Sequence, residues 1–335
     1  MRARRNVMSE PLRLGLIGCG HWGKNYAAAI AGMDDVALAW CADTSEAARE
    51  RARALNPGVR LTPDLNELLA APDCDGVIIA APPQQHASVA HAAIAARKPV
   101  LVEKPLATTS AAARDLATAA RSAGITAVSG HVYLFHPVVV EIVNRIRSGT
   151  TGRLRFMSAS RAFTRLASSD DRPDVDALWD LAPNDLAMFV AFAAALPQRV
   201  FCARSAFFRP DLADAAFAIL EFPEGLTAEL RVSWDYPRRE RLVTVVGANE
   251  ALWFDDDSQT KLLSYAGPPV DLAGRQGAPI ECSSVPSLSE QIRHFVDVIR
   301  TGEPTRAPFE FGVDIVRILE ALSHSADVGM AVSLS

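Results

Sequence analysis

The sequence predicts an α/β protein with two domains: a Rossmann domain with a doubly wound parallel sheet, then an α+β domain built on an open, largely antiparallel sheet. In the first 130 residues, apolar runs alternate with alanine-rich segments long enough for helices, which is typical of parallel βαβ units. After Phe135, strand-like runs follow one another with few helices between them, which indicates antiparallel pairing. A chain of 335 residues also exceeds one typical core, so two domains are expected.

Five runs in the first part of the chain are almost continuously apolar, as expected for parallel strands that are buried on both faces. These expected strands are residues 12–18, 36–42, 76–81, 99–103 and 126–130. Helices that cross over the sheet are expected at residues 24–32, 45–55, 64–71, 85–96 and 109–123. The domain boundaries predicted from this pattern are a disordered tail at 1–11 and a dinucleotide-binding domain at 12–132.

Residues 133–335 are expected to form the second domain. Its helices are expected at residues 137–147, 288–301 and 309–327, with a further buried helix over Leu186–Leu196. Its strands are expected at residues 199–208, 214–222, 227–235, 242–247 and 251–255. The segment 256–287 is rich in Pro, Gly, Ser and Asp and therefore predicts loops.

Composition and charge exclude several classes of protein. A net charge of −5 is small and favours neither nucleic acid nor an anionic membrane surface as a partner. The basic opening "MRARRNVMSEP" has no apolar core behind it, unlike a secretory signal, and no apolar run reaches the roughly 18 residues of a membrane span. The scattered cysteines show no metal-binding spacing, which predicts reduced thiols, a cytoplasmic location and no metal site. They are Cys19, Cys41, Cys74, Cys202 and Cys282.

A glycine-rich motif follows the first expected strand, in "GLIGCGHWGKN". Its glycines, Gly18, Gly20 and Gly23, have the G-x-G-x-x-G spacing of a dinucleotide-binding turn, with His21 and Trp22 between them. Such glycines permit a tight turn and let the backbone approach a pyrophosphate at the N-terminus of the next helix. The alternative is a tight turn that binds no ligand.

An acidic residue at the end of the next strand bears on the choice of cofactor. Asp43 follows Gly23 by 20 residues, where a carboxylate can hydrogen-bond the adenosine ribose. The same carboxylate repels a 2′-phosphate, and the segment "ADTSEAA" has no arginine to receive one. NAD is therefore expected rather than NADP. The alternative is an aspartate that only caps the following helix.

The expected strand at 76–81 ends in "AAPPQQH". Because ligands bind at the carboxyl ends of parallel strands, Ala81, Pro82 and Pro83 are expected to line the cofactor site. His86 opens the following helix, where it either contacts the cofactor or serves packing alone.

The expected strand at 99–103 runs into the tripeptide "EKP". Glu103 and Lys104 are therefore delivered to the same end of the sheet as the glycine motif, where both are expected to face the cofactor. Pro105 stiffens the turn and restricts the backbone of Lys104. A partly desolvated lysine held in this way is a candidate general acid/base. The alternative is a solvated Glu–Lys pair that contributes little.

A second group of polar residues lies in "ALWDLAPNDLAMFVAFAAAL", residues 177–196. Pro183 suits the first position of a helix, and Asp185 then suits a carboxylate that faces the positive end of that helix. Capping does not explain Asp180 and Asn184. Their spacing of four residues puts them on one side of a helical turn, where they can converge on a ligand.

The glycine motif, "APP" followed by a histidine, and above all "EKP" resemble the Gfo/Idh/MocA oxidoreductases. The resemblance covers essentially the whole chain, through "GHVYLFHPVV", "GRLRFMSASRAF", "WDLAPND", "VTVVGANEALWFDD" and "EQIRHFVDVIRTGEPTR". It implies a Rossmann domain followed by an open sheet that binds substrate and supports oligomers, here a homodimer or homotetramer. Most such proteins move a hydride between NAD(P) and a carbon of a sugar, cyclitol or nucleotide sugar.

The resemblance also implies roles for particular residues. Lys104 matches the lysine that contacts the reacting oxygen. Asp180 matches the aspartate of a D-x-x-x-H element, and Asn184 stands where that element has its histidine. Asparagine donates and accepts hydrogen bonds but cannot shuttle a proton near neutral pH. Further residues of the substrate region are expected from the same resemblance: His131, Tyr133, His136 and Arg161.

The sequence therefore predicts a NAD(H)-dependent oxidoreductase that acts at a C–OH/C=O carbon of a carbohydrate, with a nucleotide sugar preferred. Lys104 is expected to handle the hydroxyl proton, while Asp180 and Asn184 position the sugar. Two alternatives stay open. One is a ketone or imine reductase for a specialised metabolite, in which Tyr133 or His136 donates the proton. The other is a cofactor-binding protein with little turnover.

Overall fold

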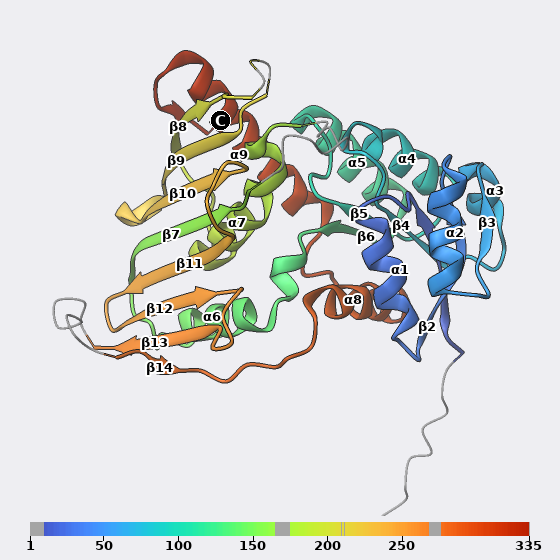
Figure 1. Cartoon of the computed structure of the whole chain (residues 1–335), viewed down its shortest axis with the longest axis horizontal. Coiled ribbons are helices and arrows are strands. Elements are labelled where there is room, and N and C mark those ends of the chain that lie inside the picture. Colours follow the sequence, from blue (N-terminus) through green and yellow to red (C-terminus); the bar gives the residue numbers. More distant parts are fainter. Residues whose placement is uncertain (1–9, 165–174, 209, 211, 268–275, 335) are drawn as a thin grey trace, which may run out of the picture. The chain divides into compact units, whose positions relative to one another are not determined.

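The computed structural model describes residues 10–164, 175–208, 210, 212–267 and 276–334. The expected tail at 1–11 thus falls largely outside the described residues. The chain divides into two compact units, each assembled from separate segments (Figure 1). The first comprises Met1–Glu103, Asp115–Gly130 and Leu288–Phe309, and the second comprises Lys104–Arg114, His131–Ser287 and Glu310–Ser335.

The first unit is built on a six-stranded sheet in the order β3-β2-β1-β4-β5-β6, in which every pair is parallel. This order confirms the predicted Rossmann fold. The strands are β1 (Leu12–Ile17), β2 (Val36–Ala42), β3 (Arg60–Thr62), β4 (Gly76–Ile79), β5 (Val100–Glu103) and β6 (Ala127–Gly130). The sequence analysis missed β3, because a strand of three residues is too short to show a hydrophobic pattern.

The helices between these strands lie close to their expected positions. They are α1 (Gly23–Ala31), α2 (Glu46–Leu55), α3 (Leu65–Ala70), α4 (Pro83–Ala95) and α5 (Ser110–Ala123). A late segment of the chain, which includes most of α8 (Ser287–Thr301), also belongs to this unit. It is tied to β6 through the Ser129 amide, which donates to the carbonyl of Ala307 at 2.8 Å.

The second unit is built on a nine-stranded sheet in the order β14-β13-β12-β11-β7-β10-β9-β8-β15. Only the β7–β10 pair is parallel among these strands, so the predicted largely antiparallel sheet is confirmed. The strands are β7 (Leu154–Ala162), β8 (Arg199–Ser205), β9 (Ala215–Glu221), β10 (Thr227–Ser233), β11 (Glu240–Gly247), β12 (Glu250–Asp255), β13 (Leu262–Ala266), β14 (Ala278–Pro279) and β15 (Val332–Ser333).

Two details of this sheet correct the sequence analysis. The segment 256–287 was expected to contain only loops, yet β13 and β14 lie in it. Both strands are short. Strand β13 pairs with β12, and β14 pairs with β13 at the edge of the sheet, so pairing compensates for weak intrinsic strand preference. Arg161, expected just after the first strand of this sheet, lies within β7.

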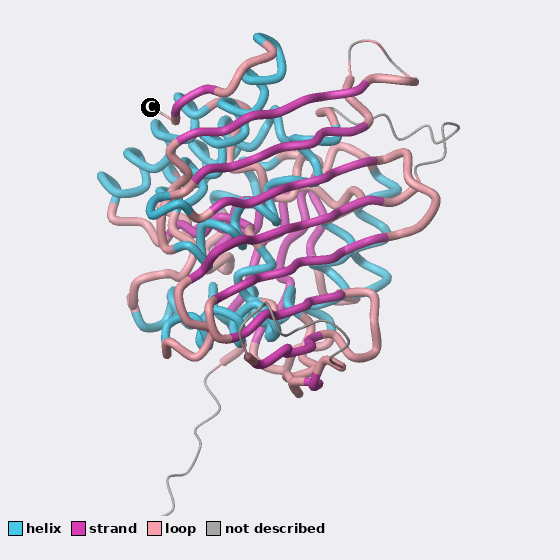
Figure 2. The backbone as a smooth tube through the Cα atoms, turned by 90° about the vertical axis from the view of Figure 1, so that its left-hand side faces the viewer, coloured by secondary structure: helices cyan, strands magenta, loops and turns pink. Residues whose placement is uncertain are grey.

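The helices of the second unit include α6 (Pro137–Arg147), α7 (Ala177–Ala193) and α9 (Phe309–Val328), with the short 3₁₀ helices η1 (Val132–Phe135) and η2 (Pro223–Gly225). Helix α7 packs on one face of the sheet against β7, β9 and β10. The strands cross the other face in open view, and no helix of the described chain covers it (Figure 2). The sheet is therefore buried on one face only.

Helix α7 begins earlier than the sequence suggested. Asp176 caps it by accepting a hydrogen bond from the Trp179 amide at 3.0 Å, and Pro183 lies inside the helix rather than at its first position. The capping side chain of Asp176 outweighed the signal from the proline, whose ring usually favours the first turn. Asp180 and Asn184 are consequently one turn apart on the same helix.

Candidate functional site

The glycine motif forms a tight turn between β1 and α1. Gly18 has a φ of +89°, and a Cβ on it would lie 2.7 Å from the backbone of Ala80 and Ala81. A Cβ on Gly23 would lie 2.0 Å from the carbonyl oxygen of Gly18, whereas a Cβ on Gly20 would meet no atom within 4 Å. The first and third glycines are thus required by packing, and the second leaves the backbone open to a ligand.

The N-terminus of α1 suits an anion. No side chain caps it, and no acidic residue lies in its first turn, so neither competes with a phosphate for the terminal amides. His21 and Trp22 lie exposed beside this turn, with their rings edge to face and the ring centroids 6.4 Å apart. The turn therefore fits the pyrophosphate of a dinucleotide.

Asp43 ties the end of β2 to the glycine motif. Its Oδ2 accepts a hydrogen bond from the Cys19 amide at 2.6 Å, and its Oδ1 accepts one from the Ser45 amide at 2.8 Å. The guanidinium of Arg49 donates to the carbonyl oxygen of Asp43 at 2.6 Å. The expectation that no arginine lies nearby is therefore wrong, because helix α2 turns Arg49 back toward the end of β2.

Two of the five cysteines lie beside this motif. The sulfur atoms of Cys19 and Cys41 lie next to each other, whereas their Cα atoms are 7.3 Å apart, farther than in an ordinary disulfide. That the cysteines are reduced therefore stays a prediction. Cys19 follows β1 and Cys41 lies in the neighbouring strand β2, so residues separated by 22 positions in the sequence meet in the sheet.

The turn after β4 lies beside the glycine motif, as predicted. Pro82 caps α4, Pro83 is its first residue, and the carbonyl oxygen of Ala81 lies 2.8 Å from Nε2 of His86. The His86 side chain is buried, with 1% of its surface exposed. This contact between Ala81 and His86 holds the turn after β4, which would line the site of a bound cofactor.

Glu103, at the end of β5, points to α1. The Tyr26 hydroxyl donates to Glu103 Oε1 at 2.6 Å and also lies 3.1 Å from Oε1 of Gln291, a residue of α8. Burial first, and then the charge of Glu103, raise the pKa of Tyr26 well above its ordinary value, so the phenol keeps its proton. Glu103 thus helps to fix the helix that starts at the glycine motif.

In the second unit, Lys104 meets Asp180. The Lys104 ammonium donates to the Asp180 carbonyl oxygen at 2.6 Å and lies 3.3 Å from Oδ1 of the same residue. The Lys104 side chain is 8% exposed and that of Asp180 is 32% exposed. The Trp234 indole N–H donates to the other carboxylate oxygen at 3.3 Å, so the Asp180 carboxylate is held from two sides.

Two buried polar side chains of the second unit have atoms with no hydrogen-bond partner among the described residues. They are Asn184, at its Oδ1, and His131, at both ring nitrogens. Burial first, and then the charge of Lys104, lower the pKa of His131 to about 3, so the imidazole is neutral. The His131 ring also packs edge to face on Phe311.

Tyr133, His136 and Arg161 are brought together in a buried network. Arg161 forms two hydrogen bonds with Asp185, from Nε to Oδ2 at 2.7 Å and from Nη2 to Oδ1 at 2.9 Å, and a third to the Tyr133 hydroxyl at 3.0 Å. That hydroxyl donates to Asp256 Oδ2 at 2.8 Å, and His136 Nε2 lies 3.3 Å from Oδ1 of Asp256. Asp185 is therefore an ion-pair partner in the middle of α7 and not a cap.

The charges in this network reinforce one another. Burial is the largest single effect and lowers the pKa of Arg161. The charges and hydrogen bonds of Asp185 and Tyr133 together outweigh it and raise the pKa above its ordinary value. Burial alone would raise the pKa of Asp256, but hydrogen bonds from His136, Lys261 and Tyr133 lower it far below 3.8. Asp256 was not predicted as part of this network, because Tyr133 and His136 precede it by more than 100 positions.

Stability should therefore depend on pH through Asp256. Because the pKa of Asp256 is lowered in the folded state, its carboxylate contributes fully to the free energy of unfolding above about pH 4. This contribution is lost as the pH falls further. Urea unfolding at several pH values between about 6 and 3 is expected to show the free energy of unfolding falling with pH. The difference between the wild type and Asp256→Asn should shrink over the same range. A constant difference would contradict the assignment.

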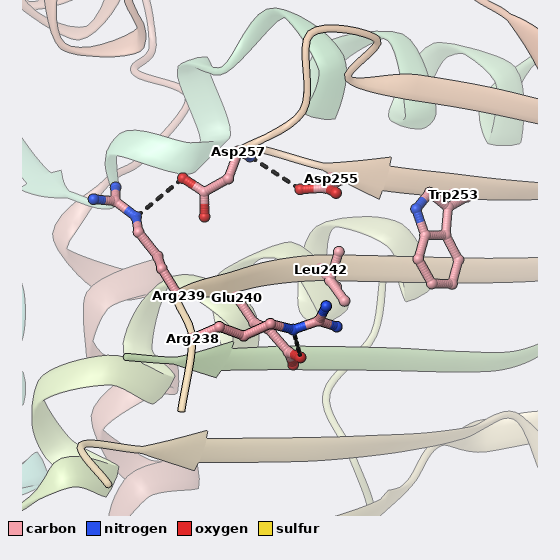
Figure 3. Close-up of a pocket in the computed structure, with 7 residues that line it drawn as sticks. All are labelled: Arg238, Arg239, Glu240, Leu242, Trp253, Asp255 and Asp257. Carbon is pink, nitrogen blue, oxygen red and sulfur yellow. Dashed lines mark hydrogen bonds and ion pairs between the residues drawn. The ribbon is translucent and has the colours of Figure 1, made fainter. Parts of the chain in front are cut away.

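A separate hollow of about 200 Å³ lies on the open face of the sheet. Its charged groups pair with one another: Arg239 Nε lies 3.0 Å from Asp257 Oδ1, and Arg238 Nε lies 3.0 Å from Glu240 Oε1 (Figure 3). None of the residues predicted to form the site lines it. Trp253, which is 39% exposed, forms its apolar side.

Other kinds of site receive no support from the described residues. They contain no group of three or more His, Cys, Asp or Glu that could hold a metal ion. Among their helices, none has both the length and the apolar character that crossing a bilayer requires.

Comparisons with known proteins match both units. Residues 12–131 match the oxidoreductase family with an NAD-binding Rossmann fold, and residues 139–252 match the GFO/IDH/MocA C-terminal domain. An inositol 2-dehydrogenase from Acidothermus cellulolyticus is 38% identical, although the match spans 42% of each chain. Inositol 2-dehydrogenase 2 from Saccharopolyspora erythraea is 27% identical over 95% of this chain and 94% of its own. The crystal structure of a putative oxidoreductase from Magnetospirillum magnetotacticum MS-1 is 30% identical, with a TM-score of 0.82 over 93% of this chain and 100% of its own.

Proposed function

Because the chain belongs to the Gfo/Idh/MocA family of NAD(P)-dependent oxidoreductases, we propose that it transfers a hydride between NAD(H) and a C–OH/C=O carbon of a sugar, cyclitol or nucleotide sugar. The observation that carries this proposal is the contact between Lys104 and Asp180, a nearly buried ammonium held against a partly exposed carboxylate. A lysine and a carboxylate side by side can bind adjacent hydroxyls, and the lysine can accept a proton from one of them once it is the neutral amine.

The first unit supports the cofactor half of this proposal. The open backbone at Gly20 and the uncapped N-terminus of α1 suit a pyrophosphate, and the Asp43 carboxylate beside them suits a ribose hydroxyl. The turn at Ala81–Pro83 completes the set of residues proposed to hold the dinucleotide. When bound, the nicotinamide ring would supply or accept the hydride.

The second unit supports the substrate half. In the direction of oxidation, Lys104 in its neutral amine form takes the proton of the reacting hydroxyl and becomes the ammonium, while the hydride leaves the same carbon. The Asp180 carboxylate accepts a hydrogen bond from a neighbouring hydroxyl. Asn184 lacks a titrating group, so it contributes a hydrogen bond and no proton transfer. Tyr133, His136 and Arg161 act by holding α7 in position, since their polar groups bind one another and Asp185.

A panel of polyols tests the proposal. Purified protein is mixed with NAD⁺ and, in separate assays, with myo-inositol, common aldoses and UDP-sugars, and NADH formation is followed. We expect turnover with at least one class, and its loss in Asp180→Ala. Turnover only with ketones or imines in the reductive direction would favour a reductase of other metabolites. NADH binding without turnover in either direction would contradict an enzymatic role.

Cofactor preference gives a second test. Asp43 repels a 2′-phosphate, so NADH is expected to bind at least tenfold more tightly than NADPH, or about 1.4 kcal/mol. Calorimetric titration with both cofactors measures the difference. Because Arg49 lies against the Asp43 carbonyl, Arg49→Ala is the matched control and should retain the preference, whereas Asp43→Ser should lose most of it. Equal affinities in the wild type would contradict the assignment.

The open face of the nine-stranded sheet supports a homodimer. It presents five exposed apolar side chains from four strands of the sheet: Phe156, Phe201, Phe217, Ile219 and Trp253, each 37–49% exposed. Phe201 pairs with Ile219 on the neighbouring strand, and Phe217 lies two residues along that strand, so these three form one apolar patch. Exposed apolar patches mark interaction surfaces, and one patch that meets its own copy across a twofold axis is the commonest oligomeric arrangement. We propose that a second copy of the chain covers this face.

Oligomeric state is expected to depend on this face. Phe217→Asp should shift the protein to monomers in sedimentation velocity, since a carboxylate would be buried at the interface. Leu55→Asp, an equally exposed apolar residue on α2, is the control and should leave the oligomer intact. A Phe217→Asp protein that stays oligomeric would exclude this face.

A further inference from the structure

We propose that His131 is a substrate-contacting residue, whose neutral imidazole donates one hydrogen bond and accepts another at the hydroxyls of the carbohydrate beside Lys104 and Asp180. This inference rests on the proposed function. It assigns to His131 the imidazole that Asn184 does not provide.

The first observation is the state of the His131 ring. The residue is 1% exposed, and both ring nitrogens lack a hydrogen-bond partner among the described residues. A buried polar group without a partner costs free energy, and native structures leave few of them. Groups of this kind are retained where a ligand satisfies them.

The second observation is the surroundings of the ring. Glu103 pairs with Gly130 in the parallel strands β5 and β6, so Lys104 and His131 directly follow paired residues, and both belong to the second unit. Phe311, from α9, packs edge to face on the ring with centroids 5.4 Å apart and fixes its plane. A neutral imidazole has one donor and one acceptor, which matches the donor and acceptor of a hydroxyl.

The third observation is that Asn184, on α7, is also incompletely satisfied. Its Oδ1 is buried and has no hydrogen-bond partner in the part of the chain that the structure describes, although the residue lies one turn from Asp180 on the same helix. Two of the second unit's functional candidates thus carry unused polar atoms. A carbohydrate with several hydroxyls would satisfy both.

His136, the other buried histidine of this region, does not qualify. Its Nδ1 accepts a hydrogen bond from the Val138 amide at 3.2 Å, and its Nε2 lies 3.3 Å from Asp256 Oδ1. Both nitrogens are therefore engaged within the protein. Sequence spacing alone did not separate the two histidines.

Thermal unfolding of the free protein gives the first test, and it needs no substrate. If the nitrogens of His131 are unsatisfied in the free protein, His131→Phe and His131→Leu should raise Tm by about 2–4 °C, because an apolar group replaces an unpaired polar one. Two variants are used because one ring or one branched chain can fit badly. A lower Tm in both would show that the protein itself satisfies the nitrogens, and would overturn the proposal.

Steady-state kinetics with the polyol that is turned over in the panel gives the second test. His131→Phe should lower kcat/KM by about tenfold or more, while the NADH dissociation constant changes less than about twofold. His131→Asn and His131→Gln place an amide near Nδ1 and Nε2, respectively, and recovery of activity in one of them identifies the nitrogen in use. His91→Phe, at an exposed histidine of the other unit, is the control and should behave as the wild type.

The outcomes separate this inference from the proposed function. Unchanged kcat/KM in His131→Phe, on a polyol that the wild type turns over, would contradict the role of His131 and leave the oxidoreductase assignment standing. Turnover of no polyol at all would contradict the proposed function, and the inference would fall with it.

Discussion

Lys104→Met is expected to lower kcat by at least about 100-fold, the usual contribution of a positioned acid/base, and to leave the NADH dissociation constant almost unchanged. The physical reason lies in the contacts of the ammonium. It is nearly buried and held by the carbonyl and carboxylate of Asp180, within the second unit, whereas the residues proposed to hold the pyrophosphate and ribose lie in the first. Methionine keeps the length of the side chain and removes both charge and proton.

Lys104→Arg separates charge from proton transfer. Arginine preserves the positive charge and the capacity to bind the Asp180 carbonyl, but it stays protonated and cannot accept a proton. The kcat of Lys104→Arg for oxidation should therefore fall about as far as that of Lys104→Met, whereas its KM should rise less than that of Lys104→Met. Steady-state kinetics on the active polyol, with calorimetry for NADH, measures both. A variant at position 104 that retains wild-type kcat would remove Lys104 from the mechanism.

The second large effect is expected on stability. Asp185→Asn should lower the free energy of unfolding of the second unit by about 3–5 kcal/mol, because it leaves the buried guanidinium of Arg161 without its counter-charge. The two side chains are 8% and 1% exposed, and two hydrogen bonds join them. The same ion pair connects α7 to β7, so its loss should also loosen the helix that carries Asp180 and Asn184.

Two further variants control this experiment. Glu224→Gln removes a carboxylate from an exposed ion pair, in which the Arg153 side chain is 69% exposed and the Glu224 side chain is 81% exposed. It should change the free energy of unfolding by less than about 1 kcal/mol. Replacing both partners, with Arg161→Met and Asp185→Leu together, should recover much of the loss, because neither charge of this pair remains without its partner. Urea unfolding monitored by tryptophan fluorescence provides the values. Equal losses of stability in Asp185→Asn and Glu224→Gln would contradict the inference that Asp185→Asn leaves the buried Arg161 guanidinium without a counter-charge.

Much of the first unit followed from the sequence alone. Parallel strands buried on both faces must be apolar along their length, so five of the six strands were visible as hydrophobic runs. The spacing of Gly18, Gly20 and Gly23 is a local requirement of one turn, and the structure shows which glycine each contact requires. The direction of parallel strands then brings the glycine motif, Asp43 and the turn after β4 to one edge of the sheet.

What only the tertiary structure decided concerns contacts between residues far apart in the chain. Asp185 looked like a helix cap because local rules see only Pro183 beside it, whereas its partner Arg161 lies 24 positions earlier on β7. Arg49 lay outside the short segment searched for an arginine, and His131 could not be told from His136 by spacing. Local sequence determines the backbone preference and the hydrophobic period of each segment. The partner of a polar side chain depends instead on how distant strands and helices pack. Those long-range contacts decide which polar groups are paired within the protein and which are left for a ligand.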